Sequence, residues 1–337
     1  MPCLLFLRAR CQLPNAATLA GDFQKTRAAL QASGIIDEHD HWGAGTTTVV
    51  QVGDQLDRGG EELAILLLLE RLKHEAAAVG GALYTINGNH EIMGTQGDIR
   101  YVEMPAAGID FDRWHYYYSF GQKLKRNCGL DAPPPPAPSL TPSGVIPPAL
   151  TKRWQALQPG GPISSRFLAT QNCVLLVGDT VFVHGGLLPE HVEYGVENVN
   201  LITEQWLLNK HDITDKETAA RRKSLLRGKE AVVWSRHFSS TKNEPECELL
   251  DQVLSMLDAS RMVVGHTIQK TGITSACSNK VHRVDVGLSK GCRDGPLEVL
   301  EITDDTSVKI LNRVARESVT EGEDAKPSQD ASSCSIL

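Results

Sequence analysis

The first half of the chain alternates short apolar runs with segments of helical periodicity. β-Branched and apolar residues fill 46–53, and a similar run fills 82–88. Between them an amphipathic stretch begins at Glu61 and ends at two glycines. A strand, a helix and a strand in this order predict a βαβ unit, in which parallel strands are covered by helices. Upstream, apolar residues at helical spacing predict a helix that begins near Asp22.

The second half predicts further strands and helices around a proline-dense segment. Residues 131–148 predict an exposed insertion with polyproline II character. After it, two short apolar runs joined by Gly178-Asp179 predict a hairpin. We expect helices over 197–209, 216–223 and 246–259, and strands in RMVVGH, HRVDVG and LEVLEIT. From Thr306 strand pairing is expected to fade, and the polar, mostly acidic segment 304–337 predicts disorder.

Composition narrows the class of protein. With 41% hydrophobic and 22% charged residues among 337, the chain is typical of soluble globular proteins. A net charge of −7 without a basic stripe argues against a nucleic-acid partner. No apolar run is long enough to cross a bilayer; the longest is 63–69. Eight scattered cysteines without framework spacing predict a reducing compartment, and hence a cytoplasmic protein.

Both ends of the chain leave alternatives open. Residues 1–20 are atypical: they hold Arg8 and Arg10 and no acidic residue, which fits organellar import but also a first strand or an irregular end. The last four residues fit a prenylation motif at Cys334, which would bring membrane association. The acidic sequence before Cys334 gives no second anchoring signal, so such an anchor would be weak.

Polar residues with metal-binding side chains follow four of the predicted strands. Asp54, Asn89 with His90, His184 and His266 each come directly after an apolar run. The carboxyl ends of strands in helix-connected sheets are where ligands gather, so we expect these side chains to converge. One carboxylate, one amide oxygen and imidazoles suit a transition metal such as manganese, iron or zinc.

These blocks also carry a family resemblance. GDQLDRGG (53–60), GNHE (88–91), HGG (184–186) and GH (265–266), in this order and spacing, resemble the signature of calcineurin-like metallophosphoesterases of the phosphoprotein phosphatase type. Within that family the chain is most similar to the Shewanella-like protein phosphatases. The resemblance covers 21–303 and implies one phosphoesterase domain with an α/β fold, a four-layer αββα sandwich of two mixed sheets flanked by helices.

The resemblance also implies a metal centre. Two divalent cations (Mn, Fe or Zn) would share a water and present it as hydroxide to phosphorus. Asp54 resembles the carboxylate that bridges the two metals. Asn89, His184 and His266 resemble the other protein ligands of the second metal.

The acid and the phosphate-binding groups follow from the same motifs. His90 resembles the general acid that protonates the leaving alkoxide, and Asp57 resembles the group that orients it. Arg58 and Arg236 resemble the arginines that bind phosphate oxygens, for which a planar guanidinium fork is suited. The implied substrate is a phosphorylated protein (Ser/Thr or Tyr) or a small phosphomonoester.

One motif of the family is missing. The first metal needs an Asp and a His from a GDxHG motif, and the matching positions hold Thr18 and Ala20. Neither residue replaces a carboxylate or an imidazole. Either the chain has an altered or truncated start, or it is a divergent member. Two functions therefore stay open: a metal-dependent phosphatase, or a catalytically impaired homologue that binds phosphorylated partners.

The sequence predicts less about the elements that surround the site. The aromatic residues of 113–123 are expected in the core rather than along a cleft. The helix around Trp154 and the proline-rich insertion are expected to form a cap over one side of the site.

Overall fold

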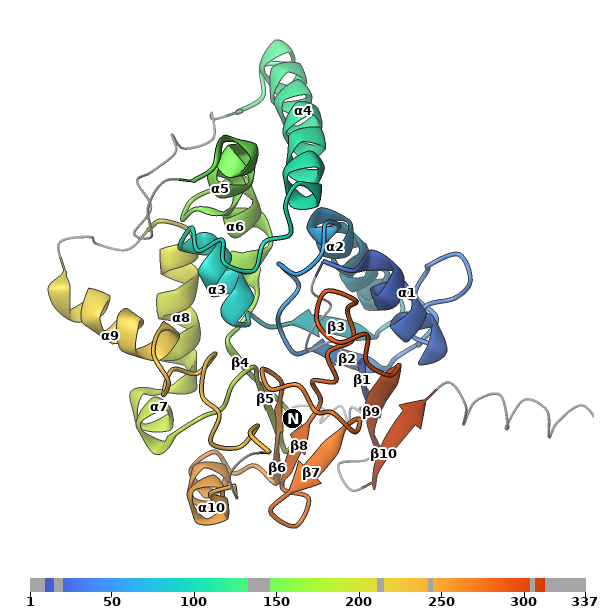
Figure 1. Ribbon diagram of the computed structural model, residues 1–337, viewed down its shortest axis with the longest axis vertical. Coiled ribbons are helices and arrows are strands. Elements are labelled where there is room, and N and C mark those ends of the chain that lie inside the picture. Colours follow the sequence, from blue (N-terminus) through green and yellow to red (C-terminus); the bar gives the residue numbers. More distant parts are fainter. Residues whose placement is uncertain are drawn as a thin grey trace, which may run out of the picture.

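Two five-stranded mixed sheets form the centre of the part of the chain that the structure describes, with helices around them (Figure 1). The computed structural model describes residues 10–14 (backbone only), 21–132, 146–210, 215–241, 245–303 and 307–312. The first sheet has the order β10 (Ser307–Asn312), β9 (Glu298–Thr303), β1 (Arg10–Pro14), β2 (Thr48–Gln51), β3 (Ala82–Thr85). The second has the order β4 (Val174–Val177), β5 (Thr180–Val183), β6 (Arg261–Val264), β8 (Val281–Arg283), β7 (Thr274–Ala276). The predicted α/β sandwich of two mixed sheets is confirmed.

The strands that precede the candidate site residues run parallel within each sheet. In the first sheet β1, β2 and β3 are parallel, and β9 and β10 are antiparallel additions at one side. In the second sheet β5, β6 and β8 are parallel, and β4 forms with β5 the hairpin predicted at Gly178-Asp179. The carboxyl ends of β2 and β3 therefore share one edge, as do those of β5 and β6.

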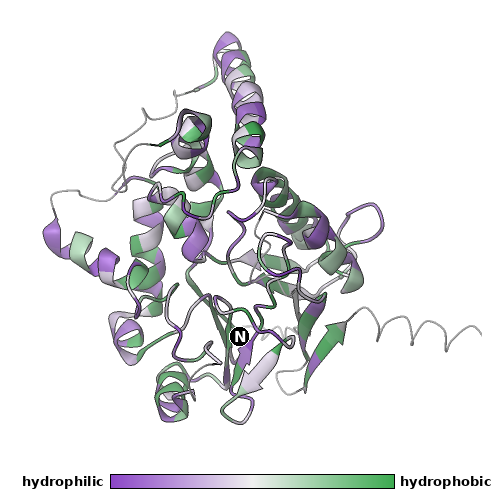
Figure 2. Ribbon diagram, in the orientation of Figure 1, coloured by the Kyte–Doolittle hydropathy of each residue, from purple (hydrophilic) through white to green (hydrophobic). Residues whose placement is uncertain are grey.

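Strand β5 is buried on both faces. Val181 and Val183 lie in the hydrophobic cluster that includes helices α8 and α10, whereas Phe182 between them lies in the cluster that includes β2 and α2. All three side chains are fully buried. Because successive side chains point to opposite faces, this continuous apolar run fits a strand between two layers. Figure 2 shows hydrophobic residues concentrated on α2 and the central strands.

The helices that the pattern predicts begin and end close to the expected residues. The helix predicted near Asp22 is α1 (Phe23–Ala32), where Asp22 Oδ1 accepts the backbone N–H of Lys25 at 3.1 Å. The helix predicted from Glu61 is α2 (Glu62–Ala78). The remaining helices are α3 (Asn89–Thr95), α4 (Ala106–Asn127), α5 (Thr151–Leu157), α6 (Pro162–Arg166), α7 (Pro189–Tyr194), α8 (Val196–Leu207), α9 (Lys216–Leu226) and α10 (Cys247–Met256), with 3-10 turns at Pro148–Leu150 and Leu168–Thr170. None of the described helices has the length and apolar character to span a membrane.

The two ends contribute strands to the first sheet. Of the atypical segment 1–20, Arg10–Pro14 forms β1 and pairs with β2 and β9. The expectation that strand pairing fades from Thr306, within a disordered segment 304–337, is wrong for residues 307–312, since Ser307–Asn312 forms β10. Its alternation of Val308 and Ile310 with polar residues is a strand pattern, and Val308 packs on the core. Residues 1–9, 15–20 and 313–337, including the motif at Cys334, lie outside the described residues, as does 133–145 of the insertion.

The aromatic segment 113–123 is a helix, and its expected place in the core is wrong except for Trp114, which packs against the core. It belongs to α4, and Tyr116 and Tyr117 expose 69% and 65% of their surface. The buried residues of α4 are Ala107, Gly108 and Phe111, which all lie in the first half of the helix. The pattern misled because successive aromatics on a helix point in different directions, so most of them cannot face one core.

The expectation of reduced cysteines is wrong for one pair. Cys247 at the start of α10 is disulfide-bonded to Cys277, which follows β7. These residues are 30 positions apart, and that spacing alone gives no sign of their pairing. Cys128, Cys173 and Cys292 are free among the described residues.

Candidate active site

Four of the predicted site residues converge at the carboxyl ends of β2, β5 and β6 and at the start of α3. His184 Nε2 lies 3.2 Å from Asp54 Oδ2 and 3.0 Å from Asn89 Oδ1. His266 Nδ1 lies 2.7 Å from the same Asn89 oxygen. All four side chains are buried. Residues that are up to 212 positions apart in the chain thus surround one point.

The hydrogen-bond pattern at His184 requires a positive charge at this point. His184 Nδ1 donates to the backbone carbonyl of Val52 at 2.7 Å. In a neutral imidazole the other nitrogen then carries a lone pair, which here faces the Asp54 carboxylate and the Asn89 carbonyl. Three electron-rich atoms in contact need a proton or a metal cation between them. Burial opposes charge on His184, but Asp54 outweighs it and raises the pKa of the imidazole.

His266 has the properties of a neutral ligand. Burial, followed by the neighbouring His184 and Arg236, holds the pKa of His266 well below its usual value, so the ring is uncharged at neutral pH. Its Nε2 is buried and has no hydrogen-bond partner among the described residues. A neutral imidazole is the form that binds metals.

This donor set fits one divalent cation. Within the described ranges no group of three or more His, Cys, Asp or Glu side chains has the geometry of a metal site. That finding includes Asp54, His184 and His266, so the case for a cation rests on the chemistry of the donors. Asp54 Oδ2, Asn89 Oδ1, His184 Nε2 and His266 Nδ1 would be its ligand atoms. Two oxygens and two nitrogens match the preference of manganese, iron or zinc.

Among the described residues no ligand set for a second cation is found. Thr18 and Ala20 stand where the other ligands are expected; they lie outside the described residues, and their side chains offer no carboxylate or imidazole. The nearby Asp22 is engaged elsewhere. Its Oδ1 caps α1, and its Oδ2 accepts the backbone N–H of Lys290 at 3.1 Å.

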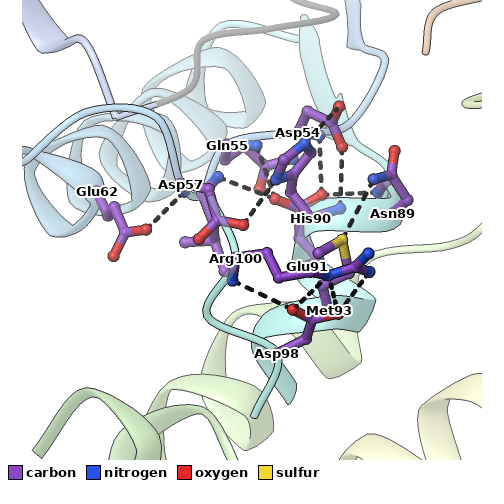
Figure 3. A network of polar contacts seen from close by, with 12 residues as sticks. Asp54, Gln55, Asp57, Glu62, Asn89, His90, Glu91, Met93, Asp98 and Arg100 are labelled. Carbon is purple, nitrogen blue, oxygen red and sulfur yellow. Dashed lines mark hydrogen bonds and ion pairs between the residues drawn. The ribbon is translucent and has the colours of Figure 1, made fainter. Parts of the chain in front are cut away.

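A buried carboxylate holds the loop that carries Asp54. Asp54, Asp57 and Arg58 have φ angles of 59°, 66° and 64°, a left-handed conformation that is unfavourable for these residues. Glu91 stabilises the loop, because its carboxylate accepts backbone N–H groups of residues 54, 55, 56 and 88 at 2.7–3.1 Å (Figure 3). Gly88 is required here, since a Cβ on it would collide with the Asp54 carboxylate.

His90 and Asp57 form a buried pair beside this point (Figure 3). His90 Nδ1 donates to Asp57 Oδ2 at 2.7 Å, while His90 Nε2 lies 4.0 Å from Asp54 Oδ2. Burial disfavours the imidazolium, but the carboxylates of Asp54 and Asp57 outweigh this and raise the pKa of His90 to about 9. In the metal-free protein His90 is therefore protonated at neutral pH.

The two arginines predicted to bind phosphate line different cavities. The Arg58 guanidinium lies 4.2 Å from the ring centroid of Tyr101 and borders a cavity of about 680 Å³. Arg236 borders a cavity of about 750 Å³, and its Nη1 donates to the carbonyl of His266 at 3.1 Å and to Thr267 Oγ1 at 2.6 Å. Both of these acceptors are neutral, so the two contacts leave the charge of Arg236 available.

Comparison with known proteins gives the family. The model of the calcineurin-like phosphoesterase family matches residues 20–270. The chain belongs to this family. It is 45% identical over 301 residues to Shewanella-like protein phosphatase 2 of Arabidopsis thaliana, covering 87% of this chain and 75% of that protein. It is 27% identical over 277 residues to Shewanella-like protein phosphatase 1 of Plasmodium berghei, covering 80% and 65%. The resemblance stated from the motifs is confirmed.

Solved structures agree with this phosphoesterase at the level of the fold. The crystal structure of the cold-active protein-tyrosine phosphatase of a psychrophilic Shewanella species has a TM-score of 0.62. The two share 21% sequence identity, and the match covers 90% of this chain and 80% of the other. At this identity the likeness supports the metallophosphoesterase fold alone.

Three residues of the phosphoesterase site were missed from the sequence. Glu91 had a signal, because a Glu three positions after the N-cap is a helix-capping pattern. Tyr101, between Arg58 and His90, had none: its ring centroid lies 5.2 Å from that of His90. Arg153, which contacts Asp57, also had none. Arg153 belongs to α5, so the helix around Trp154 does border the site.

Proposed function

We propose that this phosphoesterase is a metal-dependent phosphatase that hydrolyses phosphomonoesters, and that its substrates are phosphorylated proteins. The observation that carries the proposal is the convergence of Asp54, Asn89, His184 and His266 beside the His90–Asp57 pair. The names of its relatives support the substrate class.

The ligand roles follow from the donor atoms. Asp54, Asn89, His184 and His266 would hold one divalent cation. When bound, such an ion supplies Lewis-acid stabilisation of the phosphoryl oxygens and activates water as a nucleophile. The protein orients the ligands through its backbone: the Val52 carbonyl fixes the tautomer of His184.

His90 would act as the general acid. Because Nδ1 is bonded to Asp57, Nε2 is the atom that can donate a proton to the leaving oxygen. An oxygen of water forms a bond to phosphorus and its proton passes to solvent, while the bond from phosphorus to the leaving oxygen breaks. The leaving oxygen takes the Nε2 proton, and neutral His90 recovers a proton from solvent. Asp57 would keep the ring in this orientation and favour its charged form. Arg58 and Arg236 would bind phosphate oxygens and neutralise the dianion.

A second function is favoured by Thr18 and Ala20. With ligands for one cation only, the chain would bind phosphorylated partners through the arginines and catalyse weakly. The two proposals predict different metal contents: two ions per chain for the phosphatase, one for the binding protein.

The test compares the natural chain with a Thr18→Asp/Ala20→His variant. Metal content after manganese loading and hydrolysis of p-nitrophenyl phosphate are measured for both, with His90→Gln as the inactive control. Full activity in the natural chain, not raised in the variant, would rule out the binding protein. A natural chain that binds one ion and has no activity, beside a variant that binds two ions and is active, would rule out the phosphatase.

A further inference from the structure

A buried arginine connects the helix α5 to the candidate active site. Arg153 exposes 2% of its surface. Its Nε donates to Glu62 Oε2 at 2.8 Å, and its Nη2 donates to Glu62 Oε1 at 2.7 Å and to Asp57 Oδ1 at 2.8 Å. Arg153 is 96 positions from Asp57 in the chain.

These contacts divide the Asp57 carboxylate between two partners. Oδ1 accepts from Arg153 at 2.8 Å, and Oδ2 accepts from His90 at 2.7 Å. The backbone N–H of Asp57 donates to Glu62 Oε1 at 2.6 Å, so Glu62 holds the main chain of the same residue. With both oxygens and the backbone bonded, rotation of the carboxylate about Cβ–Cγ would break at least one strong hydrogen bond.

Charge makes the arginine necessary for this arrangement. Asp57 and Glu62 are both fully buried, and Glu62 Oε1 and Asp57 Oδ1 share Nη2 of Arg153. Without a cation, two buried carboxylates that share this one donor nitrogen would repel one another. The Asp57 side chain would then turn away, and His90 would lose the acceptor that sets its ring orientation.

We infer that Arg153 is a positioning residue, which holds the Asp57 carboxylate so that Asp57 orients His90 for proton donation. The inference rests on the proposed role of His90 as general acid. Its geometry requires an arginine. A lysine has one ammonium group on a flexible stem and cannot form the fork to Glu62 while also reaching Asp57.

A purely structural ion pair would also be lost in a substitution, so the test needs a readout of orientation. The first is nuclear magnetic resonance of the metal-free protein. A ring N–H of His90 bonded to Asp57 gives a downfield proton signal, which is assigned by its absence in His90→Gln. We expect Arg153→Met to lose or shift this signal and Arg153→Lys to retain it in part.

The second readout is sensitivity to the leaving group in the metal-loaded protein. Phenolate is a poor leaving group that needs a proton, whereas p-nitrophenolate needs it less. We expect Arg153→Met to lower kcat for phenyl phosphate about tenfold more than kcat for p-nitrophenyl phosphate, within the usual contribution of a general acid. The double variant with His90→Gln should be no more selective than His90→Gln alone.

Arg261→Met is the matched control. Arg261 is buried and pairs with Asp179 at 3.0 Å, but it lies at the amino end of β6, away from the site. The Arg261→Met variant should leave the His90 signal and the sensitivity to the leaving group unchanged. An unchanged His90 signal in Arg153→Met would overturn the inference. If Arg153→Met does not fold, an unchanged His90 signal in Arg153→Lys would overturn it instead. Equal loss of both esters in His90→Gln would instead reject the general acid, while the resonance signal still tests Arg153.

Discussion

The carboxylate of Glu91 offers a direct test of how the site is built. It is fully buried and accepts four backbone N–H groups. Oε1 accepts from Gln55 at 2.7 Å and Leu56 at 3.1 Å, and Oε2 accepts from Asp54 at 2.8 Å and Gly88 at 2.7 Å. Replacing Glu91 with Gln keeps the shape and turns one oxygen into an NH₂ group.

The loss of unfolding free energy in Glu91→Gln can be worked out because the two carboxylate oxygens accept equal numbers of hydrogen bonds. Each oxygen holds two of the four bonds, so either orientation of the amide loses two and points donors at donors. A hydrogen bond to a charged group is worth about 1.5–3 kcal/mol, which gives a loss of about 3–6 kcal/mol. Burial and the neighbouring Asp54 raise the pKa of Glu91, and relief of that cost offsets part of the loss. We therefore expect Glu91→Gln to lower the free energy of unfolding by about 3 kcal/mol, a large share of the usual total of about 5–15 kcal/mol.

The assay is urea unfolding of the metal-free protein, followed by tryptophan fluorescence. Glu75→Gln is the control, since Glu75 is about a quarter exposed and accepts one backbone N–H, from Trp42 at 2.8 Å. It should lose no more than about 1 kcal/mol. A Glu91→Gln variant within about 1 kcal/mol of the natural protein, or an equal loss in both variants, would refute the reasoning.

Three further predictions concern His282, the disulfide between Cys247 and Cys277, and Arg236. Burial and Arg261 lower the pKa of His282 to about 4. Between pH 6.5 and 4 the unfolded chain thus binds a proton that the folded protein does not, so unfolding free energy falls by up to about 3 kcal/mol as pH falls, and His282→Gln should flatten this slope in urea titrations. Replacing both Cys247 and Cys277 by serine opens a link between residues 30 positions apart and should cost about 3–4 kcal/mol; a loss below about 1 kcal/mol would contradict this. Arg236→Met should lower kcat/KM for p-nitrophenyl phosphate about 10- to 100-fold, with partial recovery in Arg236→Lys, and unchanged steady-state kinetics would reject its phosphate-binding role.

The convergence at the site could be predicted because it depends on backbone topology. Parallel strands joined by helices place their carboxyl ends at one edge, so Asp54 and Asn89 after one pair of strands, and His184 and His266 after another, had to lie near each other. Apolar runs reveal such strands directly. Helical periodicity likewise gave the positions of α1, α2, α8, α9 and α10 to within a few residues, but it did not predict α3, α4, α6 and α7.

Contacts between distant side chains could not be predicted in this way. Arg153 reaches Asp57 from a short helix beyond the proline-dense insertion, and no periodicity marks it. The disulfide of Cys247 and Cys277 likewise depends on how α10 packs near the β7–β8 turn. The exposed half of α4 was misread because Tyr116, Tyr117 and Phe120 expose more than half of their surface, whereas pattern analysis assumes that such aromatic residues are buried.

The first strand separates what the fold needs from what the chemistry needs. β1 pairs with β2 and β9 through backbone hydrogen bonds, which depend little on side-chain identity. The sheet can therefore form although the sequence after β1 holds Thr18 and Ala20. Metal binding has no such tolerance, because it needs specific donor atoms. The four ligands proposed for one cation come from other strand ends, so we expect binding of that ion to be independent of residues 18 and 20.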